Sequence, residues 1–471
     1  MGALSVARVA LACAAFGLLV PPWYGLERGF AGWPGGEAAP LAVLLIGGSA
    51  WWLWPVPLLL LACAPSLLGR RAEGQVLIAS GAGAVAWVFL QGWAIGLPGT
   101  VWSLAAPLVG DASQPALGWG ATFLLAGALG LLAAGLAARG RFGGDAFVAF
   151  LVLGSAALLI LFVFAPLLTI LSAAAVADGE IAPGAMVRRL AAPEAWSLAC
   201  VTGSFGCGVV WNTLALATLT GVLSTLLGLA FALLSARANV HAGGAFRALA
   251  ILPLITPPFV VSLSLIVLFG RTGMVTEALS ALFGIPRSRW IYGMPGVLIA
   301  QLLAFTPIAF MLLEGAVRQI APSLEEAAST MGARRFTVFR TVTWPLLRPG
   351  LAAAFLLGFV ESLSDFGNPL VLGGDFDVLA TRIFFAIAGA RHDPGRAAAL
   401  ALLLLGLTFG AFALQTAWLG KRRYITVTGK GDAGAPTPLP RGLAIACGAV
   451  AFPWMAFTAI VYAIIMLGAF V

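Results

Sequence analysis

The sequence predicts an all-α polytopic membrane protein, and three observations support this fold class. Hydrophobic residues make up 61% of the 471 positions and charged residues only 9%, whereas soluble domains carry about 25% charged residues. Apolar runs long enough to cross a bilayer recur along the chain. The remaining basic residues lie mainly in alternate loops between these runs. A soluble protein of this composition would lack the polar surface that it needs.

The apolar runs predict about eleven transmembrane helices. A helix needs about 17 to 25 largely apolar residues to cross the hydrocarbon core. The expected spans lie near 5–22, 40–64, 76–97, 118–138, 146–172, 210–236, 247–270, 296–317, 350–372, 397–419 and 442–470. The formal charge of +8 comes from arginines in the loops between these spans, so it does not indicate nucleic-acid binding.

The first four helices, up to about residue 140, carry almost no motif, and we interpret them as packing and anchoring helices. A more polar segment at 174–209 follows a long uncharged helix, and a delivery protein could contact it. Cys200 and Cys207 lie in this segment and could form a disulfide. The next run, at 211–237, is rich in small residues that suit close packing of membrane helices.

Three prolines interrupt the apolar stretch ILPLITPPFV at 251–260. Pro253, Pro257 and Pro258 predict a broken helix, because proline lacks the backbone N–H that the helix requires. Such a break is tolerated in a membrane where the freed backbone groups face protein or a watery path. We favour a role in lining a translocation pathway, and a simple packing kink is the alternative.

The longest charged interruption is SLEEAASTMGARRFTVFRTVTWP at 323–345, which predicts two short helices joined at a glycine. Ser323 followed three residues later by Glu326 has the pattern of a capping box at the start of the first helix. Gly332 suits the left-handed conformation that ends a helix. We expect a second short helix after this glycine, and we expect Pro345 to stop it.

The spacing of this stretch resembles the EAA loop of ABC-importer permeases, whose pattern reads E-A-A-x3-G-x9-I-x-L-P. The matching residues are Glu326, Ala327, Ala328, Gly332, Val342, Trp344 and Pro345. Val342 and Trp344 depart conservatively from the isoleucine and leucine of the pattern. In that family the segment is a cytoplasmic coupling helix that docks in a groove of a separate ATPase subunit. An ordinary basic cytoplasmic loop is the alternative.

The resemblance implies roles in ATPase coupling that fit the residue types of the loop. Small residues would permit close approach, phenylalanines would supply apolar anchors, and arginines would supply charge for the partner and for the inner membrane surface. The residues implicated are Ser323, Glu325, Glu326, Ala327, Ala328, Gly332, Arg334, Phe336, Phe339 and Pro345.

Placing this loop in the cytoplasm fixes the side of every other loop. The inside then receives 17 of the 26 lysines and arginines, which agrees with the positive-inside rule. The motif and the charge bias are independent indications of the same topology. Together they predict a multi-pass protein of the bacterial inner (cytoplasmic) membrane.

The helix after the loop, GLAAAFLLGFVESLSDFGNPLVLGG, is expected to carry an acidic face. Glu361, Asp365 and Asn368 are spaced to share one face of a continuous helix. At 1.5 Å per residue, Glu361 lies roughly 16 Å beyond Gly350, near the middle of a bilayer core. Carboxylates at that depth normally face a bundle interior or an aqueous cavity. We favour a polar stripe along the transport route, and a buried pair satisfied by neighbouring hydroxyls or an arginine is the alternative.

The stretch ESLSDFGNPLVLGGDFDVLATRIFFAIAG at 361–389 is similar to permeases of the ferric-iron importer family. Phosphonate, polyamine, thiamine and sulfate importers have related but less similar segments. The resemblance implies a permease domain at 141–420, preceded by extra transmembrane helices at 1–140. It implies an ATP-driven, binding-protein-dependent importer, with ferric iron as the preferred substrate, and no enzymatic chemistry on this chain.

The same resemblance implies partners and cofactors. The partners are a cytoplasmic ATPase dimer, an extracytoplasmic substrate-binding protein, a second permease half or subunit, and the lipid bilayer, but no nucleic acid. ATP and Mg²⁺ would bind the ATPase, because this chain has no phosphate-binding G-x4-G-K-[ST] sequence. The expected pathway residues are not assigned as metal ligands, and no cofactor is expected on this chain.

A polar, Gly/Pro-rich inner linker and one further helix occupy 421–471. The helix resembles the opening of a second permease half, since iron permeases often fuse two halves in one chain. A complete subunit that pairs with a second permease chain is the alternative. A different function class is a proton-coupled secondary carrier, in which Glu361 and Asp365 would form the titrating relay.

Overall fold

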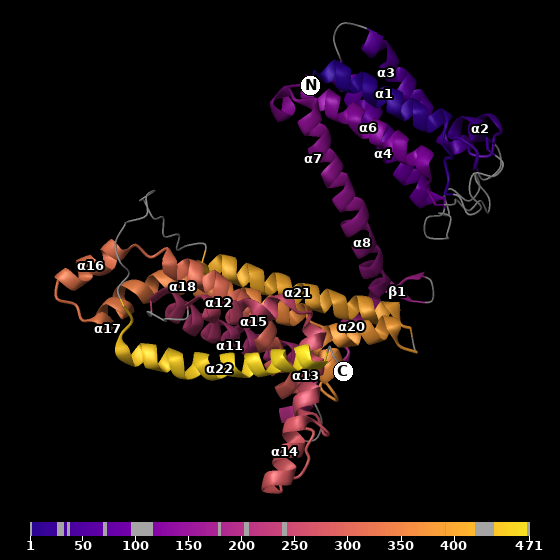
Figure 1. Cartoon of the computed structure of the whole chain (residues 1–471). Coiled ribbons are helices and arrows are strands. Elements are labelled where there is room, and N and C mark those ends of the chain that lie inside the picture. Colours follow the sequence, from indigo (N-terminus) through magenta and orange to yellow (C-terminus); the bar gives the residue numbers. More distant parts are fainter. Residues whose placement is uncertain are drawn as a thin grey trace. The chain divides into compact units, whose positions relative to one another are not determined.

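The computed structural model describes residues 2–25, 33–34, 38–68, 73–95, 116–177, 180–201, 207–237, 243–390, 392–419 and 438–468. The chain divides into two compact units, Met1–Leu167 and Leu168–Val471, and helices build both of them (Figure 1). In the described part of the chain, nine helices are long and apolar enough to cross a membrane, and shorter apolar helices accompany them. The prediction of an all-α polytopic membrane protein is therefore confirmed.

The first unit is a cluster of packed helices. Its helices are α1 (Ala3–Leu19), α2 (Leu41–Ile46), α3 (Pro55–Leu68), α4 (Gly74–Ala94), α6 (Trp119–Ala138) and α7 (Ala146–Leu159). The predicted span at 40–64 is therefore two helices. Gly47 follows the end of α2 and Gly48 has a φ of 71°, a left-handed conformation that a continuing helix does not adopt.

Backbones pack closely in this unit because glycine and alanine line the contact between α1 and α6. A Cβ atom on Gly17 would lie 2.6 Å from the carbonyl oxygen of Gly120. One on Gly127 would lie 2.5 Å from the carbonyl oxygen of Ala10. Small residues drive helix association in membranes, where lipid is as apolar as any side chain. Close van der Waals packing of complementary helix surfaces therefore holds the first unit together.

The helix α7 continues through a π-helical turn, Ile160–Phe164, into α8 (Ala165–Ser172) and then into the second unit. The helices of that unit are α9 (Pro183–Leu190), α10 (Pro193–Trp196), α11 (Val209–Arg237), α12 (Gly243–Ile251), α13 (Pro258–Phe269), α14 (Met274–Phe283), α15 (Met294–Arg318), α16 (Pro322–Thr330), α17 (Arg335–Val338), α18 (Trp344–Ser364), α19 (Gly367–Leu372), α20 (Leu379–Ala388), α21 (Pro394–Leu419) and α22 (Arg441–Gly468).

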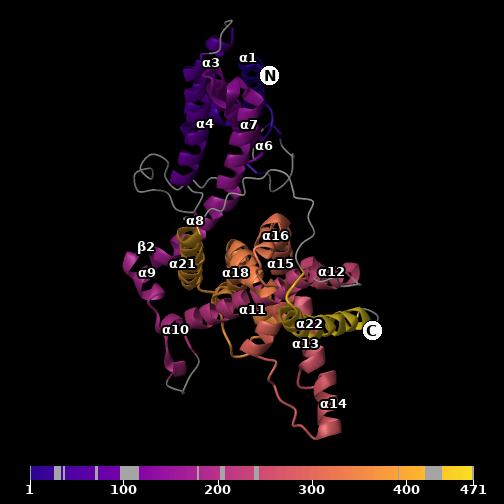
Figure 2. The same ribbon diagram turned by 90° about the vertical axis from the view of Figure 1, so that its left-hand side faces the viewer.

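The core of the second unit is the packing of α11 against α15 and α18. A Cβ atom on Gly228 would lie 2.8 Å from the backbone nitrogen of Phe310, so α11 and α15 touch backbone to backbone there. The last helix, α22, packs on α11 and α13. In Figure 1, α16 and α17 lie at one end of this unit, and α20 lies at the other. Both views show α14 extending away from α13 (Figure 2).

The segment predicted to lie outside contains two short strands and the short helices α9 and α10. The strands β1 (Val176–Ala177) and β2 (Glu180–Ile181) pair antiparallel, with Val176 opposite Ile181 and Ala177 opposite Glu180. A disulfide joins Cys200 and Cys207, as the sequence allowed. An ion pair of 2.6 Å joins Glu194 to Arg396 of α21. The predicted inner linker at 421–441 lies largely outside the described residues.

Candidate functional site

The first candidate site is the loop with the EAA spacing. Its first helix, α16, begins at Pro322, and Ala321 occupies the N-cap position. Proline is well suited to the first position, because the backbone N–H that it lacks would have no partner there and its fixed φ fits the helix. The predicted capping box of Ser323 and Glu326 is therefore wrong. Ser323 already lies inside the first turn, and no side chain caps this helix.

Gly332 ends α16 as the sequence predicts. Its φ is 86°, and its backbone N–H donates to the carbonyl of Ser329 at 2.9 Å. The N–H of Ala333 donates to the carbonyl of Ala328 at 3.1 Å. These two hydrogen bonds and the left-handed residue form a Schellman motif. A residue with a Cβ atom would be strained at this position, and proline could not adopt its φ.

The second helix of the loop does not stop at Pro345, so that prediction is wrong. From Arg335 to Ser364 the chain is one continuous helical segment, which comprises α17, a π-helical turn at Phe339–Thr343, and α18. The wider π turn directly precedes the proline. We attribute the continuity to this turn, which changes the hydrogen-bonding register where proline lacks a donor.

Exposed apolar side chains cover the outer surface of the loop. Phe336 is 61% exposed, Met331 is 83% exposed and Leu324 is 49% exposed. Arg334 and Arg335 are also exposed beside them. Exposed apolar groups rimmed by charge are typical of a protein interaction site. Phe336 and Arg334 were predicted from the sequence as coupling residues, whereas Met331 and Leu324 were not.

Other predicted coupling residues face the permease itself. Phe339 is half-buried and lies 6.4 Å from Trp344 between ring centroids. Ala328 is buried, whereas Ala327 and Glu326 are exposed. The loop therefore has two faces, of which one is available to a partner and one packs on the membrane helices.

Glu325 joins the loop to the membrane core. Its side chain is only 1% exposed and forms an ion pair of 2.6 Å with Arg237, whose side chain is 4% exposed, at the end of α11. The hydroxyl of Thr343 donates to the same carboxylate at 2.7 Å. Buried charges are stable only when they are paired and hydrogen-bonded. Glu325, predicted here as a coupling residue, is therefore an internal anchor rather than part of the exposed face.

The second candidate site is the predicted acidic face at Glu361, Asp365 and Asn368. The prediction that these residues share one continuous helix is wrong, because α18 ends at Ser364 and Asn368 lies in α19. The side chain of Asp365 accepts the backbone N–H of Asn368 at 3.2 Å, which competes with helical bonding. Pro369 then lacks the donor that a continuous helix would need.

The break brings Asp365 and Asn368 together in a buried polar network. The amide of Asn368 donates to Asp365 Oδ2 at 2.8 Å, and the amide of Gln301 donates to the same oxygen at 2.9 Å. Gln301 in turn accepts hydrogen bonds of 2.7 Å from Thr220 and Ser362. The network therefore ties α11, α15, α18 and α19 to one another.

Ser262 extends this network to α13, where its hydroxyl donates to Asn368 Oδ1 at 2.6 Å. Ser262, Gln301 and Asn368 are fully buried. The alternative that the sequence left open was a buried pair satisfied by neighbouring hydroxyls or an arginine, whereas here the side-chain amides of Gln301 and Asn368 donate to Asp365. Glu361 lies one helical turn before Asp365 and is half-buried. Its role in a pathway stays a prediction.

The three prolines do break the membrane helix as predicted. A 3-10 turn, Leu252–Ile255, contains Pro253, and α13 begins at Pro258 after the extended residues Thr256 and Pro257. Pro253 is buried, whereas Pro257 and Pro258 are exposed on the surface of this chain. The break therefore presents one buried face and one open face. Its predicted part in a translocation pathway is not tested by this arrangement.

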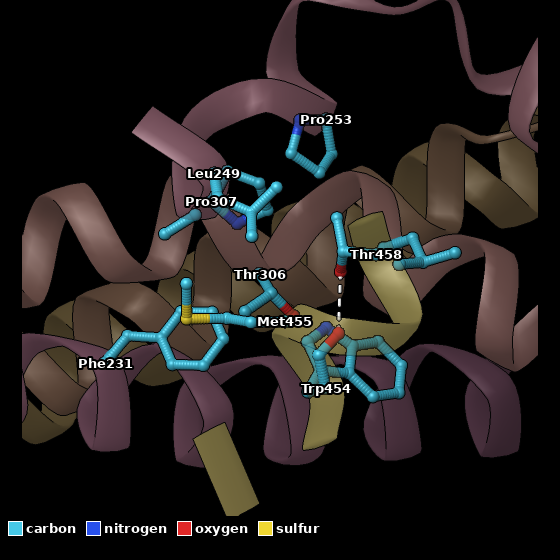
Figure 3. Close-up of a pocket in the computed structure, with 10 residues that line it drawn as sticks. Phe231, Leu249, Pro253, Thr306, Pro307, Trp454, Met455 and Thr458 are labelled. Atoms are coloured by element: carbon cyan, nitrogen blue, oxygen red, sulfur yellow. Dashed lines mark hydrogen bonds between the residues drawn. The ribbon is translucent and has the colours of Figure 1, made fainter. Parts of the chain in front are cut away.

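A small cavity lies beside the buried face of this break (Figure 3). Pro253 and Pro307 both line it, and so do Thr306 and Thr458. The hydroxyl of Thr458 donates to the carbonyl of Trp454 at 2.9 Å. Because α22 contributes Trp454 and Thr458, this last helix lines the cavity together with the 3-10 turn that contains Pro253 and with α15, which contains Pro307.

The polar network contains residues that the sequence analysis missed, namely Thr220, Ser262, Gln301 and Ser362. One signal was available, since Gln301 is a strongly polar side chain within a long apolar run. The hydroxyl residues gave no such signal, because serine and threonine are common in membrane helices. In the described part of the chain, no group of three His, Cys, Asp or Glu side chains is placed to hold a metal ion.

Comparison with known proteins identifies the family to which these features belong. A family model described as "Binding-protein-dependent transport system inner membrane component" matches residues 224–423, which include the loop, the proline break and the polar network apart from Thr220. The molybdenum transport system permease protein ModB of Mycobacterium tuberculosis is 37% identical over 185 residues, which is 39% of this chain and 69% of that protein.

Two ferric transport permeases are similar over longer stretches. The putative ferric transport system permease protein FbpB 1 of Haemophilus influenzae is 36% identical over 420 residues, which is 89% of this chain and 62% of that protein. The ferric transport system permease protein FbpB of Actinobacillus pleuropneumoniae is 45% identical over 262 residues, which is 56% of this chain and 38% of that protein. This chain thus spans less than two thirds of either ferric relative.

Proposed function

Because the chain belongs to the family of binding-protein-dependent transport system inner membrane components, we propose that it is the permease of an ATP-driven importer of ferric iron. The permease would lie in the bacterial inner membrane. An ATPase dimer would bind at its cytoplasmic face, and a substrate-binding protein would deliver iron at the opposite face. This chain would carry out no bond-making chemistry, and ATP with Mg²⁺ would bind the ATPase.

The observation that carries this proposal is the two-sided loop at 322–345. Its exposed face offers Met331 and Phe336 as apolar anchors, with arginines beside them. Its buried face is fixed to α11 through Glu325 and Arg237. An element that both binds a partner and is anchored in the membrane core can transmit the movement of that partner to the core.

Ferric iron is the substrate that the similarities favour. Both ferric permeases resemble this chain over more of its length than the molybdenum permease does. The resemblance to the Haemophilus relative extends over 89% of the chain. The binding protein would hold the metal, and the permease would only let it pass, so no resident metal site is required.

The domain organisation that we propose follows the sequence prediction. Residues 141–420 would form the permease domain, residues 1–140 would be additional membrane helices, and residues 421–471 would form an inner linker and one further helix. The end with α16 would be cytoplasmic, and the end with α20 would face the binding protein. ATP binding would close the ATPases, and the coupling loops would then switch the pathway between inward-facing and outward-facing states.

Co-purification with candidate ATPases in detergent tests the coupling loop. We expect the wild-type permease to capture a specific ATPase. Gly332→Pro should abolish this capture, because proline cannot take the φ of 86° at this position. Glu326→Arg and Phe336→Asp should also abolish it, because both change exposed residues of the loop.

The matched control is Glu277→Arg, which reverses the charge of an exposed carboxylate on α14, the helix that extends away from α13. This variant should retain the ATPase. Equal thermal stability of all variants would exclude general misfolding as the cause of lost capture. If well-folded wild-type permease of full natural length captures no ATPase, the proposed function is contradicted.

A further inference from the structure

Two buried carboxylates lie at the cytoplasmic end of the permease core, and both are paired with arginines from other elements. Glu325 on α16 pairs with Arg237 of α11. Glu314 on α15 has a side chain that is 4% exposed, and it pairs with Arg247 of α12 at 3.3 Å. It also pairs with Arg318 on its own helix at 2.8 Å.

The end of α11 joins the two carboxylates. The hydroxyl of Ser235 donates to Glu314 at 2.8 Å, and Arg237 binds Glu325 only two residues later. Side chains two residues apart point to different sides of a helix. The end of α11 is therefore held by α16 on one side and by α15 on the other. Polar side-chain contacts, joined by the helical backbone between Ser235 and Arg237, thus connect α16 through α11 and Glu314 to α12.

These contacts differ in how easily they can break. Both partners of the Arg237–Glu325 pair are almost fully buried, and separating them would leave uncompensated charge in an apolar environment. Arg247, by contrast, is 53% exposed and Arg318 is 57% exposed, so water can replace either of them at low cost. Glu314 can release Arg247 and remain compensated by Arg318 and Ser235.

We propose that this chain of contacts is a relay that carries movement of the coupling helix α16 to the proline break after α12. The relay consists of Glu325, Arg237, Ser235, Glu314 and Arg247. The Arg237–Glu325 pair fixes α16 to α11, and the Arg247–Glu314 pair is the releasable contact. Neither Arg247 nor Glu314 belongs to the EAA spacing, and the proposal rests on the proposed ATP-driven function.

The position of Arg247 explains why its release matters. It lies on α12, which leads directly into the 3-10 turn at Leu252–Ile255 and the open face at Pro257 and Pro258. A helix interrupted by proline has fewer backbone hydrogen bonds to hold its two halves in line. A change at Arg247 therefore has a short path to the segment that we expect to line the pathway.

The ratio of iron imported to ATP hydrolysed measures how well the relay transmits movement. The system is the full permease in proteoliposomes with its ATPase, with radiolabelled ferric iron supplied on the binding protein. Glu325→Gln and Arg247→Gln should each lower the ratio by about fivefold or more, the lower end of usual coupling between sites. ATPase capture in detergent should persist in both variants, because neither residue belongs to the exposed face of the loop.

Arg318→Gln is the matched control. It removes an arginine of similar exposure from the same carboxylate, but the lost contact stays within α15, so the ratio should change by less than about twofold. The Glu325→Gln/Arg247→Gln double variant should have the ratio of the worse single variant, because both changes interrupt one relay. Arg247→Lys, which keeps the charge, should recover most of the ratio.

Two results would overturn the relay while leaving the proposed function intact. The first is a ratio for Arg247→Gln equal to that for Arg318→Gln. The second is a double variant whose loss is the product of the two single losses, which indicates independent structural damage. Failure of the wild-type system to import iron with ATP would instead contradict the proposed function, and the relay with it.

Discussion

Both units of this protein hold membrane helices together through close glycine contacts, but the second unit adds a buried polar network. In the first unit, α1 and α6 approach so closely that added methyl groups on Gly17 or Gly127 would strike the opposite backbone. In the second unit, a buried network centred on Gln301 and Asp365 joins five helices. Buried carboxylates that are paired with arginines lie at the end that carries α16.

This difference has a consequence for movement. Close glycine contacts lose their stabilisation as soon as two backbones separate, so they suit a unit that remains rigid. Hydrogen bonds between side chains can exchange partners, and those in membranes are individually weak, at about 0.6 kcal/mol. We therefore expect conformational change in the second unit and rigidity in the first.

The largest expected effect is on the glycine contacts. Gly127→Leu should lower the free energy of unfolding by about 3 kcal/mol or more, because the side chain would force α1 away from α6. Thermal unfolding of the purified protein in detergent measures the change. The control is Gly154→Leu, where nothing lies within 4 Å of the added Cβ. If both variants unfold like the wild type, rigid glycine packing is not what holds the first unit.

The next effect concerns the centre of the polar network. Gln301→Leu removes three hydrogen bonds, to Thr220, Ser362 and Asp365, and should lower the free energy of unfolding by about 2 kcal/mol. The same thermal assay checks this value. A loss as large as that of Gly127→Leu would remove the distinction that we draw between the two units.

A smaller effect on the free energy of unfolding distinguishes Asp365 from Glu361, the two carboxylates expected near the middle of the membrane. In Asp365→Asn, a new amide N–H would face a donor whichever way the side chain is turned, since both carboxylate oxygens accept hydrogen bonds. The expected cost is about 1 kcal/mol. Glu361→Gln should leave stability unchanged.

Total iron import, compared with the amount of folded protein, sharpens the interpretation of the same pair. If Asp365 serves mainly the network, import by Asp365→Asn should fall only as far as the amount of folded protein falls. If it lies on the pathway, import should fall while the amount of folded protein stays constant. Complete loss with either neutral variant would favour a proton relay instead.

The smallest effect is on the start of α7. The backbone N–H of Phe147 donates to Asp145, and this holds the pKa of the Asp145 carboxyl below its usual value of 3.8. Because the folded pKa is depressed, the cap stabilises the helix at neutral pH and is lost as the pH falls through the folded pKa, below 3.8. Asp145→Ala should speed hydrogen exchange of the Phe147 amide at neutral pH, whereas Asp145→Asn should keep it slow.

Local features of the fold could be predicted from the sequence because they depend on neighbouring residues. Gly332 ends its helix, and the prolines at 251–260 break theirs, as backbone geometry requires. The start of α16 was misplaced by two residues, because Pro322 takes the first helical position and Ala321, not Ser323, is the N-cap. The end of α18 was missed because spacing alone does not show that the Asp365 side chain takes the N–H of Asn368.

Long-range contacts could not be predicted in the same way. Glu325 pairs with Arg237, which is 88 positions away, and Ser262 bonds Asn368 across 106 positions. Nothing in the local pattern distinguishes Glu325, which is buried, from its exposed neighbour Glu326. The helical face of each residue depends on where α16 packs, and that is decided by the tertiary structure.

ATP-dependent uptake of radiolabelled ferric iron into proteoliposomes tests the central claim most directly. The permease of full natural length would be reconstituted with its ATPase and its iron-loaded binding protein. We predict uptake only when ATP, the ATPase and the binding protein are all present, with no response to an imposed proton gradient. Uptake that a proton gradient drives without the ATPase, and that Glu361→Gln abolishes, would contradict the importer and indicate a secondary carrier.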